Sequence, residues 1–377
     1  MRPPIKTLFV ATSYPANLQD WRGLFIRHLA DALARRADLT VSLLAPPGES
    51  HARITPTTTA SEAAWLNDLM QQGGIAHALR QGGVAAIITP IRLLYLLRAN
   101  YRRQQHIDLY HINWLQNALP LPADGKPLLV SVLGSDMQLI NKAWMRFLLR
   151  RVFRQHATVI CPNAQWMVEP LNAGFGDVAR IAFVPFGIDP TWFAIARHIP
   201  LEQPAKWLVV SRLTKAKIGA LFEWCAPLFE GQARELHLFG PMQETIELPN
   251  WVHYHGATHP EDLCQNWFPI AHGLITLSQH AEGRPQVMLE AMAAGLPIIA
   301  SRLPAHENIV FHEKTGWLCD TAADVRMGIL HFERQDTNEA AGCAARDWVK
   351  QEVGTWDDCA ARYVSLYDAL REEARHA

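Results

Sequence analysis

The sequence predicts an α/β protein with two domains, each built on a parallel β-sheet that is covered by helices. The chain has 377 residues, a length at which two domains are the usual expectation. Each half opens with a strand–helix–strand pattern, over residues 5–44 in the first half and residues 206–239 in the second. Strands joined through a helix pair in parallel within one sheet.

Composition excludes several classes of protein. Apolar residues make up 49% of the chain and charged residues 19%, which is ordinary for a globular protein. The net charge of −1 provides no overall field that would attract nucleic acid. The six cysteines are scattered without a C-x-x-C pair, which favours reduced thiols in the cytoplasm over disulfides or a zinc site. No secretory signal and no unbroken apolar span of membrane length is expected.

In the first half, the expected strands alternate with helical segments. The strands are predicted at residues 5–11, 40–44, 108–113, 127–133, 158–161 and 181–185, with helices over 23–36 and 143–155, a loop over 46–60 and mostly helix over 61–103. The loop after the first strand lacks the glycine-rich fingerprint of dinucleotide-binding proteins, which argues against a nicotinamide cofactor.

The second half repeats this rhythm. The strands are predicted at residues 206–210, 235–239, 273–277 and 297–300, with helices over 218–229, 287–294 and 356–374. The last helix is amphipathic, because Tyr363, Leu366 and Leu370 share one face.

The strongest functional signal lies in residues 282–301. Glu290 is the only charged residue in the apolar helix predicted over residues 287–294. A buried carboxylate needs partners, and the paired hydroxyls of a ribose would satisfy it. Glu282 precedes the N-terminus of this helix, where backbone N–H groups attract phosphate. Alternatively, Glu290 simply bonds to backbone or to a distant arginine.

Two cations follow the first strand of the second half. Arg212 and Lys217 lie in the expected loop between the strand at 206–210 and the next helix. There they are well placed for a diphosphate, which arginine grips with two bonds and lysine attracts as a point charge. The alternative is a solvated basic loop, which is the interpretation favoured for the neighbouring Lys215.

Residues 282–297 read E-G-x-P-x-x-x-L-E-A-M-A-x-G-x-P, residues 212–217 read R-L-x-x-x-K, and residues 185–189 read P-x-G-x-D. These patterns closely resemble family-four retaining glycosyltransferases of the GT-B fold (glycosyl transferases group 1). The resemblance implies two Rossmann-like domains that face each other across a cleft, with the C-terminal helix crossing back to the N-terminal domain. It implies an acceptor-binding domain of residues 1–187 plus 356–377, and a nucleotide-sugar-binding domain of residues 188–355.

The resemblance also implies roles for individual residues. Glu282 would face the donor sugar and Glu290 would bind the ribose hydroxyls. The remaining donor-site residues implied are Arg212 and Lys217 at the diphosphate, Gly283, Gln286 and Val287 at the helix amides, His255 in the turn that holds the base, and Gly23 where the first loop approaches the phosphate. Gly23 also suits a plain helix-capping role.

Asp136 matches the last residue of a His-Gly-Ser/Thr-Asp site near the acceptor, and it is the fourth catalytic candidate beside Glu282, Arg212 and Lys217. Leu133 stands where the family commonly has the histidine, so a His-assisted step is in doubt. As an alternative, Asp136 caps a helix.

The implied activity is metal-independent, retaining transfer of a hexose from a nucleotide-diphospho-sugar such as a UDP-sugar. The acceptor would be a glycan or lipid-linked precursor of a surface polysaccharide or lipopolysaccharide. No D-x-D sequence occurs, so cations of the protein would replace a metal, and no cofactor is expected. The alternatives are a GT-B nucleotide-sugar epimerase or a catalytically inactive sugar-nucleotide-binding protein.

The helix predicted over residues 143–155 is amphipathic and carries four arginines. One interpretation is peripheral contact with the inner face of the membrane, which would bring a cytoplasmic enzyme to a lipid-linked acceptor. The other is an ordinary helix that packs on the sheet and turns a solvated face outward.

Overall fold

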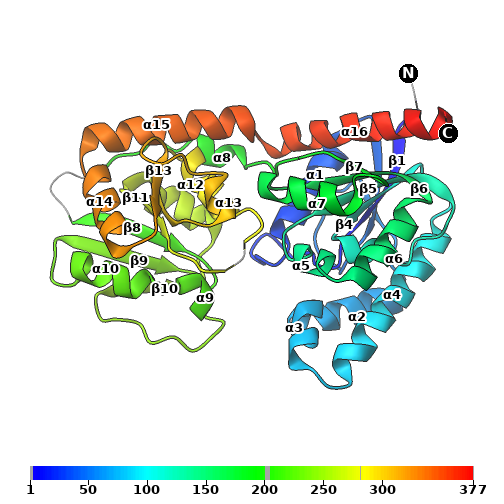
Figure 1. Ribbon diagram of the computed structural model, residues 1–377, viewed down its shortest axis with the longest axis horizontal. Coiled ribbons are helices and arrows are strands. Elements are labelled where there is room, and N and C mark those ends of the chain that lie inside the picture. Colours follow the sequence, from blue (N-terminus) through cyan, green and yellow to red (C-terminus); the bar gives the residue numbers. More distant parts are fainter. Residues whose placement is uncertain (1–2, 200–203, 281, 377) are drawn as a thin grey trace. The chain divides into compact units, whose positions relative to one another are not determined.

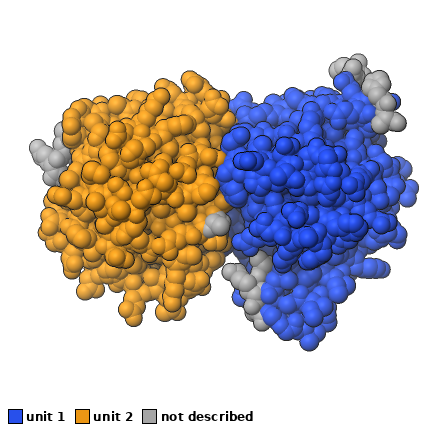
Figure 2. All heavy atoms as spheres, in the orientation of Figure 1, with its two compact units in different colours: residues 1–187, 356–377 blue, residues 188–355 orange. Residues whose placement is uncertain are grey.

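The computed structural model (Figure 1) describes residues 3–199, 204–280 and 282–376. The chain divides into two compact units, unit 1 of Met1–Gly187 with Trp356–Ala377 and unit 2 of Ile188–Thr355 (Figure 2). Each unit is built on one sheet whose described strand pairs are all parallel, so the predicted α/β fold class is confirmed.

The sheet of unit 1 has the strand order β3-β2-β1-β4-β5-β6-β7. Its strands are β1 Ile5–Val10, β2 Leu39–Leu44, β3 Ile54–Pro56, β4 Leu109–Asn113, β5 Gly125–Val132, β6 His156–Pro162 and β7 Arg180–Ile181. Successive side chains point to opposite faces, so Phe9 enters one buried cluster while Leu8 and Val10 enter the other. Both faces of the sheet are therefore covered.

Helices form the outer layers of unit 1. They are α1 Leu24–Arg35, α2 Ala60–Gln71, α3 Gly74–Gln81, α4 Ala85–Arg103, α5 Met137–Ile140, α6 Ala143–Phe153, α7 Val168–Phe175 and α16 Trp356–His376, with 3₁₀ turns η1 Leu115–Ala118 and η2 Gln165–Met167. Buried side chains of α1 and α16 share one core cluster, and those of α4, α6 and α7 share the other.

The C-terminal helix α16 is held to the sheet of unit 1 by a buried polar network. Tyr363 and Tyr367 reach inward, and the Tyr363 hydroxyl lies 2.9 Å from Ser131 Oγ. His111 bonds Ser131 through Nε2 (2.8 Å) and Tyr367 through Nδ1. Burial lowers the pKa of His111 to about 3, so the ring is neutral. The last helix thus belongs to the fold of the first unit, although 168 residues of unit 2 come between.

Unit 2 has the strand order β10-β9-β8-β11-β12-β13. Its strands are β8 Ala205–Val210, β9 Arg234–Phe239, β10 Val252–Gly256, β11 Gly273–Thr276, β12 Ile298–Ser301 and β13 Gly316–Cys319. Its helices are α8 Pro190–Phe193, α9 Lys215–Ile218, α10 Leu221–Phe229, α11 Pro260–Asp262, α12 Gln286–Ala293, α13 Pro304–Glu307, α14 Ala322–Phe332 and α15 Gln335–Glu352, with short helical turns η3 Leu263–Trp267 and η4 Phe268–Ile270. One core cluster contains α12 and α15, and the other contains α10 and α14.

Several elements differ from the sequence-based expectation. The loop expected over residues 46–60 contains the edge strand β3, whose three residues are too few to show a period. The helix expected over 218–229 is broken at Gly219 into α9 and α10. The helical region 61–103 is three helices separated by glycine pairs. The strand β13, which was not predicted, completes the second sheet.

Leu370 tests how much the last helix stabilises unit 1. Its side chain is fully buried in the cluster shared by α1 and α16. We expect Leu370→Ala to lower the free energy of unfolding of unit 1 by about 2–5 kcal/mol, because it leaves a cavity. Urea unfolding followed by circular dichroism measures this loss. The exposed Ser365→Ala on the same helix is the control and should change stability by less than about 0.5 kcal/mol. Equal stabilities would contradict the packing of α16.

Candidate functional site

The candidate site of unit 2 lies where the strand order reverses. From β8 the chain proceeds to β9 on one side, whereas β11 pairs with β8 on the other side. In open parallel sheets, ligands bind beyond the carboxyl ends of the strands at this kind of switch point. The segment after β8 carries Arg212 and Lys217, and the segment after β11 carries Glu282. Parallel pairing of β8 with β11 thus brings Lys217 and Glu282, which are 65 positions apart in the sequence, to one edge of the sheet.

Lys217 and Glu282 form an ion pair. Lys217 lies in α9, whose N-cap Thr214 accepts the Lys217 backbone N–H through its hydroxyl. Only 14% of the Lys217 side chain and 12% of the Glu282 side chain are exposed. Burial lowers the pKa of Lys217, the carboxylate of Glu282 opposes that shift, and the charge of Arg212 adds to it. The charges of Arg212 and Lys217 therefore act on each other at this edge of the sheet.

Two serine side chains that sequence reasoning missed support Glu282. The buried Ser278 hydroxyl lies 3.4 Å from Glu282 Oε1 and accepts the backbone N–H of His280 at 3.0 Å. Ser301 Oγ donates to the Ser278 carbonyl at 2.6 Å, which connects the end of β12 to this loop. Both serines lie at or just beyond a strand end, and that position was the available signal.

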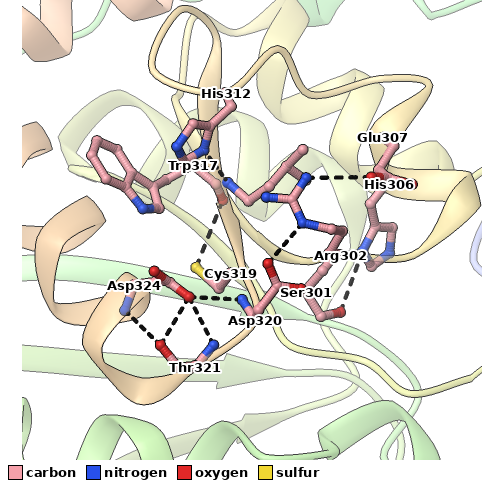
Figure 3. A network of polar contacts seen from close by, with 11 residues as sticks. Ser301, Arg302, His306, Glu307, His312, Trp317, Cys319, Asp320, Thr321 and Asp324 are labelled. Atoms are coloured by element: carbon pink, nitrogen blue, oxygen red, sulfur yellow. Dashed lines mark hydrogen bonds and ion pairs between the residues drawn. The ribbon is translucent and has the colours of Figure 1, made fainter.

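A second network holds the neighbouring segment after β12 (Figure 3). His306 is fully buried, and its Nδ1 lies 2.8 Å from the Ser301 carbonyl. Arg302 bonds Asp320 at 2.8 Å and pairs with Glu307 at 3.3 Å, so α13 is fastened to the residues after β13. The polar contacts around Glu282 therefore continue across three adjacent strand ends.

Gly219 allows the two halves of the site to approach each other. Its φ is +53°, and a Cβ at this position would lie 2.2 Å from the Leu277 carbonyl oxygen. The backbone N–H of Gln279 donates to the Ala216 carbonyl at 2.8 Å across the same contact. A glycine is required here because any side chain would push α9 away from the segment that carries Glu282.

Glu290 has a different environment. It lies four residues into α12, a rise of about 6 Å from the first residue of that helix, among buried Met288, Leu289 and Ala291. The carboxyl group is partly exposed and makes no hydrogen bond or ion pair within the described ranges. Burial raises the pKa of Glu290 to about 7, and the charge of Asp189 adds to the rise. A carboxyl group held in this way is available to an external hydroxyl.

The other predicted donor-site residues of unit 2 lie on two separate segments. Gly283, Gln286 and Val287 lie at the start of α12, where no side chain caps the helix. His255, near the end of β10, stacks on Phe239 with ring centroids 4.5 Å apart. Because β9 lies between β10 and β8, the strand that carries His255 lies about 10 Å from β8.

Two predicted residues lie in unit 1. Gly23 caps α1 with a φ of +75°, and a Cβ at this position would lie 2.9 Å from the Ser13 carbonyl oxygen. The local backbone of the loop therefore requires a glycine here. Asp136 is 1% exposed, and its carboxylate accepts backbone N–H groups of Leu115, Leu133 and Gly134 at 3.0–3.2 Å. Burial raises the pKa of Asp136 to about 6, although these donors oppose the shift. Asp136 thus holds the loops after β4 and β5 together, and its side chain makes no capping bond to α5.

Metal-ligating side chains do not gather in the described ranges. Across residues 3–199, 204–280 and 282–376, no group of three or more His, Cys, Asp or Glu is placed to hold an ion.

The two parallel sheets, each covered by helices, identify the fold as GT-B, the fold of many glycosyltransferases. The sucrose-phosphate synthase of Thermosynechococcus elongatus superposes with a TM-score of 0.71 at 17% identity, over 97% of this chain and 99% of that chain. HepE of Anabaena, solved with UDP and glucose, superposes with a TM-score of 0.67 at 14% identity, over 97% and 99% of the two chains.

Residues 205–331 match the family model of glycosyl transferases group 1. The predicted family resemblance is therefore confirmed at the level of group 1 and the GT-B fold. AmsK, the amylovoran biosynthesis glycosyltransferase of Erwinia amylovora, is 24% identical over 190 residues, 45% of each protein. A GDP-mannose-dependent alpha-(1-6)-phosphatidylinositol monomannoside mannosyltransferase of Mycobacterium tuberculosis is 24% identical over 298 residues, 68% of this chain and 75% of the relative. The match thus spans less than half the length of AmsK.

The close approach at Gly219 can be tested against a matched glycine. Gly231 also has a positive φ, of +68°, but a Cβ at that position would meet no heavy atom within 4 Å. We expect Gly219→Ala to lower the free energy of unfolding of unit 2 by at least about 2 kcal/mol more than Gly231→Ala, because only the first adds a steric clash to the backbone strain. Denaturant unfolding measures both variants. Equal losses would show that the α9 segment and the Glu282 loop do not meet there.

Proposed function

We propose that the protein is a retaining glycosyltransferase that moves a sugar from a nucleotide-diphospho-sugar to an acceptor hydroxyl. The observation that carries this proposal is the Lys217–Glu282 pair beside Arg212 at the switch point of the unit 2 sheet. Two cations and a carboxylate in this position match the chemistry of a sugar diphosphate, which presents anionic oxygens beside neutral hydroxyls.

Lys217 and Arg212 would bind the diphosphate of the donor. Lysine has three N–H donors, so Lys217 can keep its bond to Glu282 while it donates to a phosphate oxygen. The start of α12 adds the positive end of a helix dipole and backbone amides near Gly283, Gln286 and Val287. Charge grows on the diphosphate as it leaves, and donors already in place stabilise that charge without reorganising.

Glu290 would bind the ribose. Its carboxyl group is partly exposed and lacks a partner in the described ranges, whereas two ribose hydroxyls supply two donors. Its separation from the phosphate end of α12, about 6 Å along the helix, suits a ribose that follows the diphosphate. The turn at His255 would then hold the base on the outer side of the sheet.

The reaction would proceed on one face of the sugar. The bond between the anomeric carbon and the diphosphate oxygen breaks, and the acceptor oxygen bonds to the same carbon from the same side. The acceptor proton passes to the departing phosphate oxygen. Glu282 orients the sugar and stabilises its developing positive charge, without forming a covalent bond. Arg212 and Lys217 serve the purpose of a divalent metal, so transfer should persist in the presence of a chelator.

Unit 1 would bind the acceptor, with Gly23 near the donor phosphate and Asp136 shaping the loop beyond β5. AmsK is named for amylovoran biosynthesis, and WcaL of Escherichia coli for colanic acid biosynthesis. The mycobacterial relative is named for a phosphatidylinositol monomannoside. We propose a glycan or lipid-linked precursor of a surface polysaccharide as acceptor. A nucleotide-sugar donor and six unpaired cysteines suit the cytoplasm.

A product assay tests the proposed activity. Nucleotides and nucleotide-sugars are first screened by thermal shift, since a ligand stabilises the protein that binds it; uridine and guanosine diphosphates are the first candidates because HepE was solved with UDP and the mycobacterial relative uses GDP-mannose. The labelled donor is then incubated with lipid extracts. A new glycoside with the donor's anomeric configuration supports the proposal, a changed free nucleotide-sugar indicates an epimerase, and donor binding without turnover indicates an inactive binding protein.

The raised pKa of Glu290 leads us to expect that nucleotide affinity depends on pH. Because the pKa of Glu290 is raised to about 7, protonation removes the acceptor for ribose hydroxyls as the pH falls through 7. We expect nucleotide diphosphate affinity to fall about tenfold from pH 8 to pH 6 if only the ionised carboxylate binds. Isothermal titration calorimetry at several pH values measures this change.

The matched control for this pH dependence is Glu290→Gln. Glutamine has nearly the same shape and does not titrate, so it retains only the pH dependence of the nucleotide's own phosphate. The wild-type and variant curves should therefore diverge between pH 6 and pH 8. Parallel curves with equal affinity would remove Glu290 from the nucleotide site.

We expect the removal of the Lys217 side chain to lower turnover more than it lowers donor affinity. If its bond to the phosphate tightens as charge develops, Lys217→Ala should lower kcat by about 10²–10³-fold with a smaller change in donor affinity. Lys215→Ala is the control, because Lys215 is exposed on the same short helix. Steady-state kinetics and donor calorimetry separate the two effects, and a loss confined to binding would reject the proposed role.

A further inference from the structure

Helix α4 of unit 1 has apolar side chains on two opposite faces. Its inner face contributes Leu93, Leu96 and Leu97 to the buried core. Its outer face, with the N-cap residue, exposes large apolar side chains at i, i+3, i+4, i+7 and i+11. These are Val84 (71% exposed), Ile87 (65%), Ile88 (56%), Ile91 (63%) and Tyr95 (76%). This spacing places them on one continuous stripe, which core packing does not explain.

Helix α6 repeats this arrangement on the same face of the sheet. Met145, Leu149 and Phe153 point into the core cluster that also contains the inner face of α4. Trp144, Phe147 and Leu148 are exposed on the outer side. Two helices that cover one face of a sheet turn their outer sides in the same general direction, and Figure 1 shows α4 and α6 in that layer. Elsewhere in the described ranges, exposed apolar side chains of unit 2 are scattered over several elements.

The charged residues within the two segments that carry these stripes are all basic. Residues 69–107 contain five arginines and residues 137–168 contain four arginines and a lysine, and neither segment contains an Asp or Glu. Some of these cations have partners, since Arg103 pairs with Glu62 and Arg150 with Asp177. Lys142, Arg146, Arg151, Arg154 and Arg102 are exposed and form no ion pair with described residues.

We propose that the outer faces of α4 and α6 dock the protein on an anionic phospholipid bilayer. Exposed isoleucine, phenylalanine and leucine side chains would enter the boundary between headgroups and acyl chains, while Trp144 and Tyr95 suit the interface itself. The unpaired cations would bind anionic headgroups, and the absence of carboxylates from both segments avoids repulsion there. No described helix is long and apolar enough to cross a bilayer, so contact through these faces is peripheral.

A second copy of this chain is a poorer occupant than a membrane. Two copies related by a twofold axis would place these basic segments opposite each other, with like charges in contact. An anionic lipid surface instead complements both the charge and the apolar stripe. An anionic membrane therefore fits the apolar and basic side chains of this surface better than a second copy of the chain does.

Vesicle co-sedimentation tests the proposal on the full chain. Vesicles of phosphatidylcholine alone are compared with vesicles that also contain phosphatidylglycerol, at low and high salt. We expect binding to the anionic vesicles that weakens with salt, because salt screens the headgroup attraction. Ile87→Ser with Ile91→Ser should lower the apparent partition coefficient by at least about tenfold. Arg151→Gln with Arg154→Gln should lower it by about fivefold for each charge removed.

Matched controls come from α14 of unit 2. Met327 and Leu330 are 51% and 43% exposed on that helix, and Arg326 beside them is exposed. Met327→Ser with Leu330→Ser, and Arg326→Gln, make the same chemical changes away from the proposed surface. They should leave vesicle binding unchanged. Circular dichroism and thermal unfolding verify that all variants keep the fold.

Two results would overturn the proposal. The first is an absence of binding to anionic vesicles, or binding that the α4 and α6 variants leave unchanged. The second is a protein that does not bind vesicles but forms a dimer in sedimentation velocity, where Ile87→Ser with Ile91→Ser dissociates the dimer. The outer face of α4 would then be an interface between two copies of the chain. Vesicle binding requires no nucleotide-sugar chemistry, so it is decided independently of glycosyl transfer.

Discussion

The ion pair between Lys217 and Glu282 is the interaction on which the candidate site of unit 2 depends. Both side chains are largely buried, and breaking such a pair leaves an uncompensated charge, which is strongly destabilising. The pair therefore holds α9 and the segment before α12 in one relative position. Gly219 permits the backbone contact beneath it, and the serines at the ends of β11 and β12 support the carboxylate. The positions of Lys217 and Glu282 are therefore set by contacts within the protein itself.

The carboxyl groups of Asp136 and Glu290 differ in how far the protein itself satisfies them. Asp136 accepts three backbone N–H groups, so its acceptor capacity is directed to the loops of unit 1. Glu290 has no hydrogen-bond partner in the described ranges and remains partly open to solvent. Burial raises the pKa of both groups, so a shifted pKa alone does not distinguish them. The distinction rests on which carboxyl group still has an unsatisfied face for a ligand.

The two units use their surfaces differently. In unit 2 the polar groups concentrate at the carboxyl edge of the sheet, where loops from β8, β11 and β12 meet. In unit 1 the conspicuous surface is the outer layer of α4 and α6, which combines an apolar stripe with cations. A helix that is apolar on both sides is expensive to expose to water. This apolar stripe lies on unit 1, which is also the unit proposed to bind a lipid-linked acceptor. Membrane docking and acceptor binding are therefore both proposed for the same unit.

Much of this protein was determined by local sequence. The α/β class, most strand positions and the family resemblance followed from hydrophobic periodicity and from short motifs around Arg212, Lys217, Glu282 and Glu290, because these features depend on neighbours along the chain. Tertiary structure alone decided that β8 lies beside β11 and that backbone N–H groups occupy the carboxylate of Asp136. It also decided that the stripe from Val84 to Tyr95 is exposed to solvent. Strand order and solvent exposure arise from contacts between distant residues, and no local pattern records which face of an amphipathic segment another element will cover.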